Sequence, residues 1–421
     1  MSVTALCSPW HDANSRNLRM GADFEGEPTN AMTHGASRLY FDHNASAPLL
    51  PEAREALLEA LDAGGNPSSV HAEGRRAHAT VEHAREAVAA LVGAEPACVV
   101  FTSGATEAAN LALTPDWTRS GEALRRERLA VCAGDHPCLT AGGRFDPAAV
   151  EELDVDARGV IDGSMLRAWA GQGAPGLLAF ALANNESGVV QPVDPVREGL
   201  AGSDTMVVVD AVQAAGRMPL HIASLGADAL ILSGHKIGAA TGVGALVLRD
   251  EHTAPARLLR GGAQEGRLRA GTQAVAAIAS FGAAARIALR RTNTERAAML
   301  AMRERLEARL RGASPEAVFV GEGAVRLPNT LLVAAPGLRG ETAQIALDLQ
   351  GFAVSSGSAC ASGKVDVSPV LSAYARGGLA IEPALGAVRI SFGFETTDAE
   401  IDAMADAIAG LLGRARAREA A

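Results

Sequence analysis

The sequence predicts an α/β fold built around a mostly parallel sheet, with a smaller α+β unit towards the C-terminus. Short apolar runs alternate with helical patterns over most of the chain, and strands that are apolar on both faces are typical of a parallel sheet covered on both sides. After Gly271 this alternation gives way to a long helical stretch rich in Ala, Leu, Arg and Glu. A length of 421 residues favours two domains, one of them large.

The first elements of the large unit are expected to be helices. Pro51 opens a helical run at 52–61, as a proline at the first position of a helix does, and residues 75–91 repeat apolar residues at helical spacing. Short apolar strands are then expected at 98–101, 129–132, 177–182, 206–209, 229–232 and 244–248.

The second unit is expected to open with a long helix over 275–311, interrupted near Thr292-Asn293. Residues 1–37 are polar and irregular and contain no apolar core of a signal peptide, so we expect a disordered extension there. The remaining elements of the second unit are expected as strands near 331–333 and 387–392 and helices near 341–349 and 398–412.

Composition and charge argue against several classes of protein. Hydrophobic residues make up 48% of the chain and charged residues 20%, as in an ordinary soluble globular protein. A net charge of −10 argues against a nucleic-acid-binding protein, and no apolar stretch reaches the ~18 residues of a membrane-spanning helix. The five cysteines form no CxxC pair, which argues against a zinc site and against a thioredoxin-like motif, and no metal site is expected. Their sparse use fits a reducing compartment, so we expect a cytoplasmic protein.

Three polar clusters follow predicted strands, where open parallel sheets bind their ligands. Residues 102–107 (Thr-Ser-Gly-Ala-Thr-Glu) lie between a strand and a helix, where free N–H groups bind phosphate or simply form a helix cap. Asp210 follows the strand at 206–209 and is placed either to hold a protonated pyridine nitrogen or to cap a helix. Lys236, in Ser-Gly-His-Lys, follows the strand at 229–232, where desolvation lowers the pKa of an amine and favours a Schiff base.

Lysine is scarce in this chain. Lys236 and Lys364 are the only two lysines of the sequence, and its other strongly basic residues are arginines. This bias favours a chemical role for Lys236 over a surface position. A phosphate loop, an acid and a lysine, in this order, match the needs of pyridoxal 5'-phosphate. That cofactor requires a phosphate cradle, a carboxylate that keeps its ring nitrogen protonated, and a lysine for covalent attachment.

The order and the residues of these segments resemble the cysteine desulfurase family, a branch of the class V aminotransferases with the fold type I architecture. The resemblance runs from about Tyr40 to the C-terminus. It implies a large domain (51–292) that binds the cofactor on a mostly parallel seven-stranded sheet. It also implies a smaller α+β domain (38–50 and 293–421) that carries the reactive cysteine and the substrate-binding arginine. The resemblance rests on Phe-Asp-His-Asn-Ala at 41–45, Asn-Pro-Ser-Ser-Val-His at 66–71, the 102–107 loop, Asn-Asn-Glu-Ser-Gly at 184–188, Val-Asp-Ala-Val-Gln at 209–213, Ser-Gly-His-Lys at 233–236, Arg-Ala-Gly-Thr at 269–272, Ser-Ser-Gly-Ser-Ala-Cys at 355–360 and Val-Arg-Ile-Ser at 388–391.

The resemblance assigns roles to individual residues around the cofactor. Lys236 matches the lysine that binds the cofactor covalently, Asp210 the partner of the pyridine nitrogen, and Gln213 the donor to the ring hydroxyl. His136 matches the histidine that stacks on the ring and takes part in proton transfer. The phosphate ligands that it implies are Ala105, Thr106, Ser233, His235 and Thr272.

The substrate and the partner subunit are implied in the same way. Thr272 matches a phosphate ligand that reaches across to the other subunit, so a homodimer is expected. Asn185 matches a residue that contacts the cofactor or the substrate. Arg389 matches the guanidinium that binds the substrate carboxylate, a task that suits a planar, two-pronged donor.

Cys360 decides which reaction we expect. It lies in the Ser/Gly/Ala-rich run 355–362, where a mobile, exposed thiolate can attack sulfur and carry it away. The implied reaction converts L-cysteine into L-alanine and leaves a persulfide on Cys360, for transfer to an acceptor protein such as an iron–sulfur scaffold. Cys98 and Cys132 are expected in core strands, and Cys138 is expected to pack.

The sequence leaves other functions open and departs from the family's pattern at three places. A selenocysteine lyase or a transaminase of the same fold shares the cofactor residues, so only Cys360 and its loop separate these alternatives. A non-catalytic scaffold for sulfur acceptors is disfavoured by the intact cofactor set, and a nicotinamide enzyme by glycines at 242–244 that precede a strand. The family's usual Gly-Pro-Lys-Gly is replaced by Ala-Ala-Thr-Gly at 239–242, the usual Arg-Gly order is reversed within 264–269, and the loop around 376–379 is longer.

Overall fold

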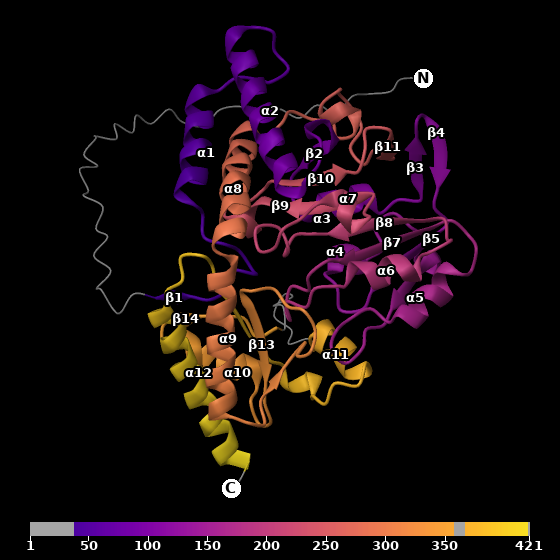
Figure 1. The fold of residues 1–421 in the computed structure, drawn as a ribbon. Helices are drawn as coiled ribbons and strands as arrows, with labels where there is room; N and C mark the ends of the chain where they lie inside the picture. Colours follow the sequence, from indigo (N-terminus) through magenta and orange to yellow (C-terminus); the bar gives the residue numbers. More distant parts are fainter. Residues whose placement is uncertain (1–37, 358–366, 420–421) are drawn as a thin grey trace, which may run out of the picture. The chain divides into compact units, whose positions relative to one another are not determined.

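The computed structural model describes residues 38–357 and 367–419, and its largest sheet has seven strands (Figure 1). In spatial order these are β2 (Val99–Thr102), β10 (Gly244–Leu248), β9 (Ala229–Ser233), β8 (Thr205–Asp210), β7 (Gly176–Ala181), β5 (Arg128–Cys132) and β6 (Val150–Leu153). The strands from β9 to β6 pair in parallel, whereas β10 is antiparallel to both β2 and β9. The predicted mostly parallel seven-stranded sheet is therefore confirmed.

Apart from the edge strand β6, these strands are largely apolar on both faces because helices cover both sides of the sheet. In β8, Val207 enters one hydrophobic core together with residues of α2 (Ala72–Val92) and α8 (Val275–Thr294). Its neighbour Met206 points to the opposite face and enters a second core with α3 (Ala105–Ala112). The other helices of this part are α1 (Pro51–Ala63), α4 (Pro137–Thr140), α5 (Gly163–Ala170), α6 (Val193–Gly199) and α7 (Ile222–Leu225).

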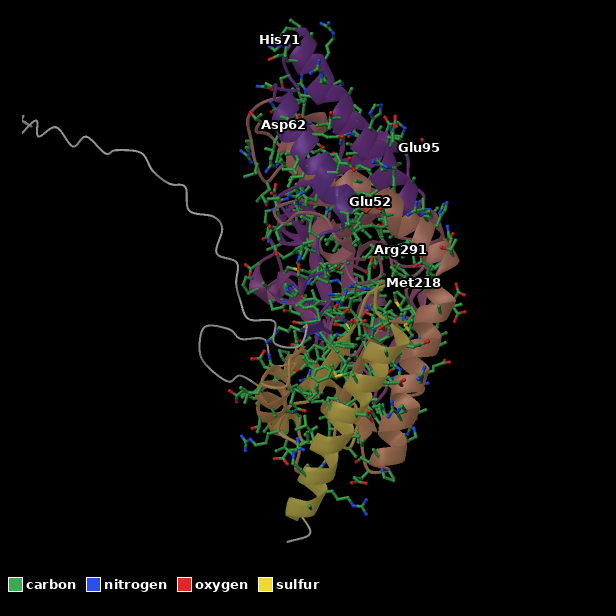
Figure 2. The ribbon with its side chains drawn as sticks, turned by 90° about the vertical axis from the view of Figure 1, so that its left-hand side faces the viewer. Glu52, Asp62, His71, Glu95, Met218 and Arg291 are labelled. Atoms are coloured by element: carbon green, nitrogen blue, oxygen red, sulfur yellow. The ribbon has the colours of Figure 1, made fainter. Side chains whose placement is uncertain are left out.

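The helices at the start of the described chain have clear local causes. α1 begins with Pro51, as predicted, and α2 begins after His71, whose ring nitrogen accepts a hydrogen bond from the Gly74 N–H. α2 ends at Gly93, whose φ of 62° is the left-handed conformation that glycine adopts readily. Asp62, near the end of α1, and His71, which precedes α2, are labelled in Figure 2.

A third core lies around a smaller antiparallel sheet. It contains Phe41 together with residues from the last part of the chain. The boundaries between the two expected domains stay predictions. The sheet consists of β12 (Val318–Phe319), β13 (Thr330–Ala334) and β15 (Val388–Ser391). The helices of this part are α9 (Arg296–Ala313), α10 (Gly340–Asp348), α11 (Pro369–Arg376) and α12 (Asp398–Glu419). A separate two-stranded sheet pairs β1 (Leu39–Tyr40) with β14 (Phe352–Ala353). In Figure 1, α9 follows α8 and lies beside α12.

Two predictions differ from the structure in detail, and one small sheet was not predicted. The break between the two long helices falls at Glu295 instead of at Thr292-Asn293. Cys98 ends a short 3-10 helix, so the first strand begins one residue later than expected. A three-stranded sheet of β3 (Asp116–Arg119), β4 (Glu122–Arg125) and β11 (Thr253–Pro255) was not predicted, because its strands are short and contain no apolar run, and β3 and β4 are mostly exposed. Within the described ranges, no helix combines the length and apolar character needed to cross a membrane.

Candidate active site

A cavity of about 620 Å³ opens at the carboxyl ends of β5, β7, β8 and β9. Its walls also include the start of α3, the segment after β1 and one residue of β15. The lining residues are Asn44, Ala45, Ser103, Gly104, Ala105, Thr106, Glu107, His136, Cys138, Ala181, Ala183, Asn185, Glu186, Asp210, Val212, Gln213, Ser233, His235, Lys236, Thr241, Gly242, Val243, Ser355, Gly357 and Arg389.

The sequence-predicted site residues converge on this cavity, with two exceptions. Thr272 is exposed and does not line it, and Cys360 lies outside the described residues. All the other predicted site residues are among the lining residues, although they come from segments far apart in the sequence. The structure thus brings these side chains together, while their individual roles stay predictions.

The amine of Lys236 lies inside the site. Its Nζ donates to the carbonyl oxygen of Asn44 at 2.6 Å and to that of Ala45 at 2.8 Å. Burial, together with the nearby Arg217 and Arg389, lowers the pKa of Lys236 to about 8, because each of these disfavours the ammonium form. A neutral amine is therefore available near neutral pH, as covalent attachment to an aldehyde requires.

Asp210 is the last residue of β8, and its carboxylate is buried at the edge of the cavity. Burial raises the pKa of Asp210 to about 6, against the opposing effects of the Val212 N–H and of Lys236. In the part of the chain that the structure describes, the Val212 N–H, at 2.8 Å, makes the only hydrogen bond to this carboxylate. A buried carboxylate that faces a cavity with so few partners fits a protonated ring nitrogen.

The loop before α3 has the form of a phosphate cradle. Gly104 precedes the first turn of the helix, and Ala105 and Thr106 begin it, so small residues leave the backbone N–H groups accessible. A side chain on Gly244 of β10 would meet the backbone of Gly104 at 2.6 Å, so this strand must carry glycine where it approaches the loop. Together with the predicted ligand Ser233 on β9, these residues fit a phosphate group.

His136 caps α4 and lies close to the lysine. Its Nδ1 accepts a hydrogen bond from the Cys138 N–H at 3.1 Å, which leaves Nε2 as the nitrogen that carries the proton in the neutral ring. Burial, followed by the charge of Lys236, lowers the pKa of His136. The thiol of Cys138 is buried, and burial together with Asp210 and Asp135 raises its pKa, which makes it a poor nucleophile.

Arg389 on β15 is held by groups that the sequence did not indicate as its partners. Its Nη2 donates to Oδ1 of Asp42 at 2.7 Å, and its Nη1 donates to the carbonyl oxygen of Asn185 at 3.1 Å. Its Nε is buried without a hydrogen-bond partner among the described residues. The guanidinium is thus oriented by one carboxylate and keeps donor capacity for another anion.

Two further charged residues at the site were missed by the sequence analysis. Arg217 is buried beside Lys236, and the only signal was an arginine in the apolar run Ala-Ala-Gly-Arg-Met. Glu186 belongs to the Asn-Asn-Glu-Ser-Gly motif, and its carboxylate accepts a hydrogen bond from the Ser368 hydroxyl at 2.8 Å. Burial raises the pKa of Glu186 to about 7, although Ser368 and Arg389 act in the opposite direction.

Comparison with known proteins points to one family. The family model described as Aminotransferase class-V matches residues 39–404. A cysteine desulfurase from Cereibacter sphaeroides is 36% identical over 387 residues, which cover 90% of this chain and 97% of the relative. A solved NifS-like protein from Rickettsia africae has a TM-score of 0.77 and 28% identity, and the match covers 89% of this chain and 99% of that one. The structure of SspA in complex with cysteine has a TM-score of 0.68 and 27% identity, covering 84% of this chain and 98% of SspA.

Proposed function

Because this chain belongs to the cysteine desulfurase family of the class V aminotransferases, we propose that it removes sulfur from L-cysteine and releases L-alanine. The family depends on pyridoxal phosphate, and the site residues fit this cofactor. The observation that carries the proposal is the convergence, in one cavity, of a buried amine with a lowered pKa, a buried carboxylate with a raised pKa and an oriented guanidinium. These are Lys236, Asp210 and Arg389.

Each part of the cofactor has residues in the cavity that would hold it. Lys236 would bind it covalently, Asp210 would hold the ring nitrogen, Gln213 would donate to the ring hydroxyl and His136 would stack on the ring. When bound, the cofactor supplies an electron-accepting ring that stabilises negative charge on the α-carbon of the substrate. The residues that would hold its phosphate are Ala105, Thr106, Ser233 and His235.

Three groups of this chain act on the substrate in the proposed reaction. Arg389 binds the carboxylate of L-cysteine, while Asp42 keeps the guanidinium in place from the other side. The neutral amine of Lys236 accepts the α-proton, which its lowered pKa permits near neutral pH. His136 carries a proton to or from the substrate thiol, since a neutral imidazole has one nitrogen that donates and one that accepts.

Cys360 takes the sulfur in this proposal. Its thiolate attacks the sulfur of the substrate and forms a sulfur–sulfur bond, and the carbon–sulfur bond of the substrate breaks. The carbon keeps the electron pair and is then protonated, so the substrate leaves as alanine. We extend the proposal to a cytoplasmic homodimer in which Thr272 reaches the partner's cofactor phosphate, and to an acceptor protein such as an iron–sulfur scaffold.

The test is incubation of the purified chain with L-cysteine, with alanine and protein-bound sulfur measured. Cys360→Ser is expected to bind the cofactor normally but to release alanine at least about 10²-fold more slowly, as happens when a nucleophile is lost. Cys138→Ser is the matched control, because this buried thiol also lines the cavity, and it is expected to retain the reaction. Added sulfur on Cys138, or alanine release by Cys360→Ser at the unmodified rate, would contradict the mechanism.

A further inference from the structure

Arg217 is a buried cation without a carboxylate partner among the residues that the structure describes. It lies in the turn after β8, and only 6% of its surface is exposed. Burying an unpaired charge is costly, so such a residue is expected to contribute something other than stability. Its guanidinium donates to Gln213 O at 2.8 Å, Gln213 Oε1 at 2.7 Å, His43 O at 3.2 Å and Lys236 O at 3.5 Å.

Arg217 lies at a second cavity, which Lys236 also lines. Lys236 lines the active-site cavity and also a second, smaller cavity of about 60 Å³. Arg217 lines the second cavity together with Arg291 of α8, and it is not among the residues that line the first. Arg291 and Met218, the residue after Arg217, are labelled in Figure 2. Among the described residues that line the active-site cavity, Gln213 and Lys236 are those to which the guanidinium donates hydrogen bonds.

The first consequence of this arrangement is a fixed amide of Gln213. Its Oε1 accepts from Arg217, and its Nε2 donates to the carbonyl oxygen of Asn44 at 3.0 Å. With the oxygen occupied by a guanidinium, the group that Gln213 presents to the active-site cavity is an N–H donor. This orientation suits the predicted hydrogen bond to the ring hydroxyl of the cofactor.

The second consequence is electrostatic. The cations that face Lys236 are Arg217 and Arg389, and the anions are Asp42 and Asp210. The neighbouring His136 and His235 both have lowered pKa values, so neither replaces a missing positive charge near neutral pH. After burial itself, Arg217 is the largest influence against the ammonium form of Lys236.

We propose that Arg217 is a positioning residue of this site, which fixes the amide of Gln213 and favours the neutral amine of Lys236. This inference rests on the proposed function, since it concerns the amine that would bind the cofactor. It predicts that the positive charge at this position matters for the lysine, whereas the guanidinium shape matters for Gln213.

The scarcity of lysine makes the electrostatic part directly measurable. In a full-length chain with Lys364→Arg, Lys236 is the only lysine, so a ¹³C-methyl label introduced by reductive methylation reports its titration by NMR. In the cofactor-free chain we expect a pKa near 8 for Lys236. Arg217→Gln should raise this pKa by about one unit or more, because a like charge has been removed from its surroundings. Arg217→Lys, which keeps the positive charge and adds a second labelled amine with its own signal, should leave the pKa of Lys236 nearly unchanged.

The matched control is Arg303→Gln. Arg303 is also buried and donates to backbone carbonyl oxygens, those of Arg326 and Leu327, but it lies on α9. This variant should leave the pKa of Lys236 unchanged. In the holoenzyme, the midpoint pH of the change in the cofactor's visible absorption should rise in Arg217→Gln and stay in place in Arg303→Gln.

An unchanged Lys236 pKa in folded Arg217→Gln, or an equal rise in Arg217→Lys, would overturn the inference. Circular dichroism shows whether each variant is folded. If Arg217→Gln does not fold, Arg217→His replaces it, since an unperturbed histidine is largely neutral above a pH of about 6.5 and should give the same rise. None of these measurements involves sulfur, so absent alanine formation would contradict the proposed function and leave this inference standing.

Discussion

Asp210 and Lys236 show at the residue scale how one cause shifts two pKa values in opposite directions. Both groups are buried, and burial disfavours the charged form of each, so the acid titrates higher and the amine lower than usual. The pKa values of the two groups, about 6 for Asp210 and about 8 for Lys236, therefore lie closer together than those of an ordinary aspartate and lysine. A cofactor with a cationic ring nitrogen would restore the charge of Asp210 and leave Lys236 free to move protons.

Asp210→Asn is expected to impair removal of the substrate α-proton while cofactor still binds. The amide cannot hold a protonated ring nitrogen, so exchange of the α-proton of L-cysteine with deuterated solvent should fall about 10²-fold. NMR of the substrate measures this exchange. Asp228→Asn is the control, because Asp228 is a half-buried carboxylate that accepts from the Val207 N–H, away from the cavity lining. Undiminished exchange in Asp210→Asn would refute the role.

The raised pKa of Asp210 also predicts a pH-dependent effect on stability. The native state binds a proton more tightly than the unfolded state, whose Asp titrates near 3.8, so this residue costs stability as the pH rises towards about 6. The cost is complete above the native pKa and absent below the unfolded one. In the cofactor-free chain, Asp210→Asn should therefore raise the free energy of unfolding at pH 7.5 by about 1–3 kcal/mol. Denaturant titrations should show little gain at pH 3.5, and an equal gain at both values would contradict this account.

At the scale of elements, six of the seven strands of the large sheet could be predicted from sequence, whereas β6 and parts of the site could not. Continuous apolar runs mark β7, β9 and β10, because every residue of these strands is buried. β4 has an exposed, charged pattern, so nothing in its residues distinguishes it from a loop. Motif residues such as Asp210 follow predicted strands and were found, whereas the burial of Arg217 depends on segments distant in sequence, such as the one that contains His43. Cys360 was predicted from its small neighbours and lies outside the described residues.

An ion pair and a hydrogen bond join the phosphate loop and its strand to the segment 264–273. Glu107 accepts from the Ser103 N–H at 2.7 Å and from Nε of Arg269 at 2.9 Å. Glu265 accepts from the Phe101 N–H at 2.8 Å, besides pairing with a buried arginine of α2. The segment includes Glu265 at a φ of 46° and Arg267 at 70°, left-handed values that are unfavourable for residues with side chains. The contacts of Glu265 hold this backbone, so the loop and the segment are expected to move together.

Glu265→Gln is expected to weaken the binding of the cofactor's phosphate in particular. The substitution leaves Arg85 without its main buried partner and should cost about 3 kcal/mol of stability. The dissociation constant of pyridoxal phosphate should rise by about tenfold, while that of pyridoxal, which lacks the phosphate, changes little. Fluorescence titration of the cofactor-free chain gives both constants. Asp204→Asn, which breaks the ion pair with the buried Arg126, is the control. An equal loss for both ligands would indicate general loosening instead.

At the scale of the whole molecule, the position of Thr272 bears on how two chains assemble. Thr272 is exposed and does not line the cavity of its own chain, although the neighbouring Gln273 donates to Glu265 at 2.6 Å. A phosphate ligand in such a position fits donation to a second copy of the chain. The active unit would then be a dimer with symmetric contacts, in which each site contains residues from both chains.

Complementation between two inactive chains tests this arrangement. Lys236→Ala lacks the amine, and Thr272→Ala is expected to lose activity when cofactor is limiting. If Thr272 is donated across the interface, a mixed dimer contains one site in which both residues are intact. Co-expression of the two chains in equal amounts should then restore about a quarter of the unmodified activity, because half of the dimers are mixed and each has one intact site. If Thr272 acts within its own chain, every site carries one defect and no activity returns. A fully active, dilute sample with the light-scattering mass of one chain would equally contradict the dimer.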